Sequence, residues 1–211
     1  GLDFFLDYQG TDNVLSKQSL EKLLPEVKEH SNYWGIDDKT MLEFSAELLD
    51  TAKTFPRLEI YHTLQSHSPF TVPNTEKYKQ EFRKRLINLE LGEKQKQDYK
   101  QYQEELITLL FADQAVRDFI QSYKKQPQFK NTIFVITGDH WLIPLPQTTA
   151  ISRYHVPIII YSAKLKNSVL FKSVNTHAEV TPSLMAMLDQ KTDLDMPEQT
   201  HWIGGLMDTT K

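Results

Sequence analysis

An apolar segment that ends in a carboxylate and an imidazole constrains this sequence more than any other feature. Residues 131–141 read NTIFVITGDHW, and residues 133–136 show no polar alternation. That pattern favours a strand buried on both faces, as in the centre of a parallel sheet covered by helices. We expect Gly138 to let the backbone turn, so that Asp139 and His140 follow at the carboxyl end of the strand, where ligands bind in open α/β sheets.

Asp139 and His140 have the chemistry of a metal-ligand pair. An aspartate supplies a hard oxygen and a histidine a borderline nitrogen, and two adjacent groups of this kind can share one divalent cation. The alternative is structural: Asp139 caps the next helix and His140 is solvated. Because adjacent Asp and His residues are common in loops, the spacing alone leaves both interpretations open.

The composition limits the class of protein. The 211 residues suit one domain with a sizeable core, and the formal net charge of −4 gives no reason to expect nucleic-acid binding. The absence of cysteine excludes disulfides, thiolate chemistry and Cys-based zinc sites. No apolar run reaches the roughly 18 residues of a membrane span, and the N-terminus lacks the features of a signal peptide. We therefore expect the chain as given to be soluble.

Strand and helix patterns alternate along the chain. Strand patterns also cover residues 57–64 and 156–161, whereas residues 2–8 fit either a strand or a packed loop. Helical apolar spacing covers residues 16–30, where Pro25 either starts a new helix or kinks the first one, and residues 38–53, 74–88, 93–125 and 180–188. Asp37 or Asp38 is expected to cap the second of these helices. The alternation predicts an α/β fold in which helices cover both faces of a parallel or mixed sheet.

His67 follows the strand pattern at residues 57–64. A lone histidine in such a place is most often a structural hydrogen-bonding group. Because the two strands would end at the same edge of the sheet, we expect His67 near Asp139 and His140, which favours a role as a ligand or an acid/base group. Asp113 lies inside an apolar helical stripe, and we expect it to cap or pair locally.

Five segments occur in an order typical of one enzyme family. They are YWGI at residues 33–36, HTLQSHSPFTVP at 62–73, FADQAVRDFIQSYKKQPQFKNTIFVITGDHW at 111–141, ISRYHVPIIIYSAKL at 151–165 and HAEVTPSLMAMLD at 177–189. Together they cover nearly the whole chain. The sequence therefore resembles the C-terminal portion of a sulfatase-like domain of the alkaline phosphatase superfamily, and most of all its lipoteichoic acid synthase and phosphoglycerol transferase branch.

The resemblance implies a three-layer α/β/α sandwich around a mostly parallel, mixed sheet and a metal-dependent reaction. Enzymes of this family use a Thr or Ser nucleophile, activated by a divalent metal, to attack a phosphate or sulfate ester and form a covalent intermediate. Asp139 and His140 match the family's ligands for Mn, Mg, Ca or Zn. His67 matches the substrate-site histidine, which binds an anionic oxygen or protonates the leaving alkoxide. Trp34 resembles the tryptophan that lines the head-group pocket, although the basic residue that follows it in the family is Ile36 here.

Three further polar residues occupy family positions, but we do not expect them to be metal ligands or catalytic groups. His155 stands where relatives often have Arg, and we expect it at a sheet edge or facing phosphate. His177 and Glu179 precede a helix, and we expect them to start that helix or to support the site from outside.

The resemblance also implies that part of the site lies elsewhere. The family's nucleophile and its remaining metal carboxylate lie upstream of the Trp-Gly segment, and residues 1–32 contain no counterpart. We therefore expect residues 1–211 to be the C-terminal portion of a single sulfatase-like domain, incomplete at its N-terminal side, with a lead-in at 1–32 and the family core at 33–211. With two of about four ligands, the chain should bind metal weakly or not at all.

These expectations leave three functions open. The first is part of a phosphoglycerol or phospho-head-group transferase that acts on anionic phosphate or sulfate esters, including lipid-linked ones. Such a parent protein would lie in the periplasm or on the extracytoplasmic face of the membrane, anchored through upstream segments. The second is a sulfatase or phosphodiester hydrolase, and the third is a nucleophile-less binding or interaction module. An upstream Thr or Ser nucleophile and acidic ligand would favour the first two.

Overall fold

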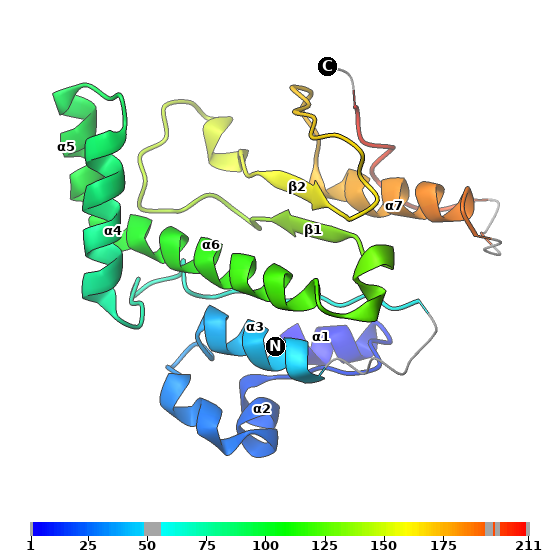
Figure 1. Cartoon of the computed structure of the whole chain (residues 1–211). Helices are drawn as coiled ribbons and strands as arrows, with labels where there is room; N and C mark the ends of the chain where they lie inside the picture. The colour runs from blue at the N-terminus through cyan, green and yellow to red at the C-terminus, as the bar shows by residue number, and fades with distance from the viewer. Residues whose placement is uncertain (1, 49–55, 193–195, 197–198, 210–211) are drawn as a thin grey trace. The chain divides into compact units, whose positions relative to one another are not determined.

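The computed structural model describes residues 2–48, 56–192, 196 and 199–209. The chain divides into two compact units, Gly1–Lys164 and Leu165–Lys211, and Figure 1 shows the elements of both. Among the described helices, none is long and apolar enough to span a membrane.

The first unit begins with short helical segments. α1 (Leu2–Tyr8) is an α-helix, so the prediction of a strand or packed loop is wrong there: the backbone N–H groups bond within the segment and not to a neighbouring strand. α2 (Lys17–Leu23) is followed by the 3-10 helix η1 (Pro25–His30). Pro25 therefore starts a new helix, which agrees with the preference for proline in a first helical turn.

α3 (Asp38–Leu48) begins at a side-chain cap. The Asp37 carboxylate accepts hydrogen bonds from the backbone N–H and the hydroxyl of Thr40, at 3.0 and 2.9 Å. These bonds confirm the predicted capping by Asp37, because they satisfy a donor that the first helical turn leaves unpaired. Residues 49–53 of the predicted helix lie outside the described residues.

α6 (Gln103–Tyr123) supports two hydrophobic cores along its length. In its first half, Phe111 packs with the buried face of α4 (Thr75–Asn88). In its second half, Phe119 packs with buried residues of α3. Figure 1 shows α6 in green between α3 and the strands.

A single helix predicted over residues 93–125 is divided in the structure. α5 (Glu93–Gln101) ends at Tyr102, whose backbone leaves helical geometry (φ −105°, ψ 30°), and α6 follows immediately. α5 buries none of its residues, so no packing requires its axis to continue into α6. The predicted helix at residues 74–88 is confirmed as α4 to within one residue.

The strands of the first unit form one antiparallel pair. After the 3-10 helix η2 (Pro127–Asn131), β1 (Phe134–Thr137) pairs with β2 (Ile158–Tyr161), and Phe134 lies opposite Tyr161. Of the predicted parallel or mixed sheet, this pair is compatible only with the mixed form. Another 3-10 helix, η3 (Ser152–Tyr154), lies in the connection between the strands.

The aromatic residues explain how the strand pair is held. Phe134 contacts Tyr123 edge-to-face, with ring centroids 5.1 Å apart, and lies close to Phe119, Phe129 and Tyr161. β1 is only half-buried, however, and Ile159 on β2 is 51% exposed. Burial on both faces was predicted for β1, but among the described residues the strand pair has helical cover on the α6 side.

Residues 57–64 form no strand, contrary to the prediction. Tyr61 packs on Phe119 of α6, with ring centroids 5.2 Å apart, so Tyr61 contributes to the core without a sheet. Leu58 and Ile60 of the same segment are 82% and 73% exposed. At its end, the backbone N–H groups of Leu64 and Gln65 bond to the side chain of Asp38 instead of a neighbouring strand. The described residues form one two-stranded sheet, so the three-layer sandwich stays a prediction.

The second unit is organised around the predicted helix near residue 180. The 3-10 helix η4 (His177–Glu179) leads into α7 (Val180–Asp189). Glu179 accepts a hydrogen bond from the Thr176 backbone N–H at 2.7 Å in a capping box, which confirms its helix-start role. Gly204 lies so close to this turn that an added Cβ would overlap the carbonyl oxygen of Ala178.

Candidate functional site

Asp139 and His140 form a compact pair just after β1. The Asp139 Oδ1 atom accepts a hydrogen bond from the His140 backbone N–H at 3.0 Å and lies 3.8 Å from His140 Nε2. His140 Nδ1 lies 2.6 Å from the carbonyl oxygen of Trp141. Because a carbonyl can only accept, Nδ1 must carry the proton, and Nε2 of the neutral imidazole keeps its lone pair.

Gly138 lies in the turn that presents this pair. A Cβ at this position would lie 3.4 Å from both Val156 Cγ1 and the carbonyl oxygen of His140, at the lower end of ordinary van der Waals contact. The glycine does not adopt a positive φ, so the backbone freedom expected from the sequence is not used here. One residue therefore separates the end of β1 from the Asp139–His140 pair.

The pair has the donor chemistry of a divalent-cation site and is accessible. The side chain of Asp139 is 71% exposed and that of His140 is 47% exposed, so neither is used in the core. A carboxylate oxygen suits Mn, Mg or Ca, and an imidazole nitrogen suits Zn. Over the described part of the chain, no three His, Cys, Asp or Glu residues gather into a metal-binding group. Asp139 and His140 therefore offer two donor groups.

Arg153 is a basic residue near this turn that sequence reasoning did not single out. Its guanidinium lies 5.9 Å from the centroid of the Trp141 ring. A guanidinium over an indole is held by cation–π attraction, which leaves its N–H donors available to an anion. Arg153 lies in the ISRYH segment, in which only the exposed His155, two residues later, was interpreted from the sequence.

Trp34 and His67 form the second pair, although they are 33 residues apart in the chain. Their ring centroids lie 4.5 Å apart at an interplanar angle of 53°. His67 Nδ1 lies 2.9 Å from the carbonyl oxygen of Ser68, so the same reasoning makes Nδ1 a donor and leaves Nε2 available. Trp34 is 51% exposed, so the pair presents an aromatic wall beside an imidazole nitrogen at the surface.

Two local features bring Trp34 to this position. The Asn32 side-chain oxygen accepts hydrogen bonds from the backbone N–H groups of Trp34 and Gly35, at 2.8 and 3.1 Å, in an Asx turn. Gly35 then approaches Leu64 so closely that an added Cβ would overlap the Leu64 Cδ1 atom. The Trp-Gly sequence therefore allows the tryptophan to lie against the loop that carries His67.

Asp38 fixes the other side of that loop and was missed as a site residue. Its carboxylate accepts hydrogen bonds from the backbone N–H groups of Leu64 at 2.7 Å and of Gln65 at 3.2 Å. The Gln65 side chain in turn accepts from the Asp38 backbone N–H and donates to the Thr71 carbonyl. Burial raises the pKa of Asp38, and these hydrogen bonds oppose that shift. The sequence signal was the Asp37-Asp38 doublet, from which only capping was inferred.

The two pairs are separate in this structure. Trp34 contacts His67, and Asp139 contacts His140, but within the described residues no hydrogen bond, ion pair or ring contact joins one pair to the other. The common sheet edge expected for His67 and Asp139 is not formed, because residues 57–64 are not a strand. Asp113 pairs with Arg117 at 2.6 Å, which confirms its local role.

Comparison with known proteins supplies an independent line of evidence. A family model described as "Sulfatase" matches residues 1–190, a span that includes the lead-in at residues 1–32. A protein named "Lipoteichoic acid synthase-like YvgJ" from Bacillus subtilis (strain 168) is 24% identical over 185 residues, which cover 79% of this chain and 27% of the relative. The chain thus spans about a quarter of the length of that relative. No solved structure gave a significant match.

Proposed function

Because the chain belongs to the sulfatase family, we propose that it supplies part of the active site of a metal-dependent enzyme that transfers a phosphoglycerol or related phospho head group. The substrate class is an anionic phosphate ester, including lipid-linked ones. The lipoteichoic acid synthase-like relative supports the choice of head group. The chain spans 27% of that relative, so the reaction is assigned to the whole protein and not to these residues alone.

The Asp139–His140 pair is the observation that carries this proposal. The Nδ1–H···O=C bond to Trp141 holds the imidazole in the tautomer that a metal ligand needs. A divalent cation held by these residues would act as a Lewis acid that neutralises charge on the transferring group. The remaining ligands and the Thr or Ser nucleophile of the covalent intermediate are assigned to the rest of the parent protein, and we expect weak or no metal binding by this chain alone.

His67 and Trp34 would act on the substrate. When protonated, His67 Nε2 can donate to an anionic oxygen or transfer its proton to the leaving alkoxide, while Nδ1–H stays bonded to Ser68. The Trp34 ring beside it offers an apolar face to a glycerol or similar head group. Asp38 helps to position His67, because it holds the backbone at Leu64 and Gln65, just before His67.

Hydrolysis is a second candidate, and the description of the matching family as "Sulfatase" favours it. A hydrolase would use the same ligands with water as the acceptor. We propose an extracytoplasmic location and membrane attachment for the parent protein on the basis of the relative's name. A binding module without a nucleophile is the remaining alternative, and it predicts no turnover in the full polypeptide.

Product analysis of the complete polypeptide tests the proposal. The enzyme would be incubated with Mn²⁺, a phospholipid with a phosphoglycerol head group and an acceptor alcohol. We expect diacylglycerol to form together with an equal amount of phosphoglycerol attached to the acceptor. Free glycerol phosphate in place of the acceptor product would indicate hydrolysis, and no diacylglycerol with any divalent metal would contradict the assignment of phosphoglycerol transfer.

A further inference from the structure

Two adjoining pockets lie between α4 and α6. Neither is lined by a residue of the Asp139–His140 or Trp34–His67 pairs. The first has a volume of about 460 Å³, and the second about 230 Å³. Arg85 of α4 and Leu110 of α6 line both. We call the two pockets together the α4–α6 groove. The two pockets therefore adjoin at Arg85 and Leu110, and they form two chemically different halves of the groove.

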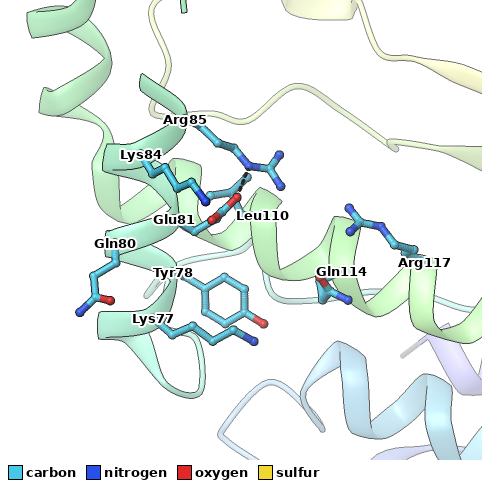
Figure 2. Close-up of a pocket in the computed structure, with 9 residues that line it drawn as sticks. All are labelled: Lys77, Tyr78, Gln80, Glu81, Lys84, Arg85, Leu110, Gln114 and Arg117. Carbon is cyan, nitrogen blue, oxygen red and sulfur yellow. Dashed lines mark hydrogen bonds and ion pairs between the residues drawn. The ribbon is translucent and has the colours of Figure 1, made fainter. Parts of the chain in front are cut away.

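The first half of the groove is cationic. Its ionisable lining residues are Glu81 and four bases, Lys77, Lys84, Arg85 and Arg117, so this half has an excess of three positive charges in a chain whose net charge is −4. Figure 2 shows these side chains around Tyr78, with Arg85 bonded to Glu81.

Not all of these cations are neutralised by neighbours. Arg85 pairs with Glu81 at 2.8 Å, and Arg117 pairs with Asp113 at 2.6 Å. Lys84 makes no ion pair with any described residue, and the Lys77 ammonium lies 5.2 Å from the centroid of the Tyr78 ring. The two lysines are therefore available to an anion, and a phosphate between them would also be within the field of both arginines.

The second half of the groove is apolar. Besides Arg85 at the junction, its lining consists of Phe82, Leu86, Leu89, Tyr99, Leu106, Leu109 and Leu110. Three of these residues are exposed: Leu89 by 50%, Tyr99 by 44% and Leu109 by 42%. Exposed apolar side chains that border a hollow lose contact with water only when a ligand covers them.

We propose that the α4–α6 groove binds an anionic phospholipid at a bilayer surface, with the phosphate in the cationic half and the start of an acyl chain in the apolar half. A simple anion would leave the apolar half uncovered, and an uncharged apolar segment would leave Lys77 and Lys84 without a counter-charge. An anionic lipid satisfies both halves. Peripheral attachment generally needs two such signals, apolar insertion and basic residues, because one alone is marginal. The inference does not depend on the proposed catalytic function.

Vesicle co-sedimentation of the purified chain tests this assignment. We expect binding to vesicles of phosphatidylglycerol and phosphatidylcholine (1:1) and at least about fivefold less binding to phosphatidylcholine alone. Lys84→Gln removes one groove charge and should weaken binding about fivefold. Arg83→Gln is the matched control, because Arg83 is an exposed cation of α4 that lines neither pocket. It should leave binding within about twofold of the unchanged chain.

A second pair of variants tests the apolar half. Leu109→Ser should weaken vesicle binding about fivefold or more, whereas Ile87→Ser, at an exposed α4 position outside both pockets, should have little effect. Circular dichroism would establish that all four variants keep their helices. The lipid assignment is overturned if the unchanged chain ignores anionic vesicles, if Arg83→Gln weakens binding as much as Lys84→Gln, or if Leu109→Ser binds normally. Displacement of the chain by millimolar glycerol phosphate would also overturn it, since that result indicates a plain anion site.

Discussion

The Asp38 carboxylate accepts a hydrogen bond from the Leu64 backbone N–H at 2.7 Å, which ties the first turn of α3 to the loop that carries His67. Asp38 is 1% exposed, so this bond lies in the protein interior. A buried carboxylate is costly unless it is hydrogen-bonded, and here it accepts from the backbone N–H groups of Leu64 and Gln65. The position of the candidate substrate-binding pair therefore depends on a residue that touches neither ring.

Replacing Asp38 by alanine should destabilise the fold. The change would leave the buried N–H groups of Leu64 and Gln65 without acceptors, at a cost of about 2–3 kcal/mol in the free energy of unfolding. Urea denaturation would measure the loss. Asp113→Ala removes a carboxylate from an exposed pair with Arg117 and should change stability by less than about 1 kcal/mol. Equal effects of the two substitutions would contradict the role given to Asp38.

The raised pKa of Asp38 predicts a specific pH dependence of stability. Between its unfolded value, about 3.9, and its higher folded value, the native state binds more protons than the unfolded state. The contribution of Asp38 to stability should therefore fall as the pH rises through this window and should grow as the pH drops. Denaturation of the unchanged chain and of Asp38→Asn at successive pH values measures the difference. A difference that is flat, or that grows with pH above about 4, would show that the hydrogen bonds outweigh burial.

Separate effects are expected at the two members of the substrate pair. In the complete enzyme, His67→Ala should depress turnover while the bound metal remains, because His67 is assigned to the substrate. Trp34→Ala should raise KM about tenfold through loss of the aromatic wall, and Trp34→Phe should restore much of this loss. Steady-state kinetics and metal analysis distinguish the outcomes. Loss of metal in His67→Ala would mean that its role is misassigned.

Phe134 should be the residue of the strand pair on which stability depends most. Its ring lies against four aromatic neighbours from α6, η2 and β2. Phe134→Ala should cost about 2–4 kcal/mol, somewhat below the loss for a fully buried ring because β1 is half-buried. Ile143→Ala, at an exposed position after the same strand, should change unfolding free energy by about 0.5 kcal/mol or less. Comparable losses at both positions would argue against the aromatic cluster as the anchor of β1.

Apolar spacing predicted α3 and α4 well because each buries apolar residues on one face. α4 and α7 agree with their predicted bounds to within one residue, and the Asp37 cap marks the start of α3. Apolar spacing could not predict the break at Tyr102. α5 buries no residue, so its sequence carries no apolar pattern that would show whether the helix continues into α6.

The strand prediction failed for residues 57–64, where a side chain is packed on the core but the backbone does not hydrogen-bond to another strand. Within residues 57–64, Tyr61 packs on Phe119, but the last backbone donors of the segment bond to the side chain of Asp38, which is distant in the sequence. An unbroken apolar run also could not reveal that β1 pairs antiparallel with β2. Both outcomes depend on contacts between distant segments, which local periodicity does not encode.

The same limit applies to the candidate sites. The Asp139–His140 pair was visible because its members are adjacent, and the chemistry of its two atoms needs no long-range information. The contact between Trp34 and His67 and the α4–α6 groove arise only when separate segments pack together.

The metal content of the complete enzyme tests the central claim most directly. Metal analysis after exhaustive dialysis, with turnover measured on the same samples, would compare the unchanged enzyme with Asp139→Asn and His140→Ala. His155→Ala is the control, because His155 is an exposed histidine of the same unit that is not assigned as a ligand. We expect both ligand variants to lose bound divalent metal and turnover together, and His155→Ala to keep the metal. Full metal occupancy and full activity in either ligand variant would contradict the assignment of Asp139 and His140 as ligands.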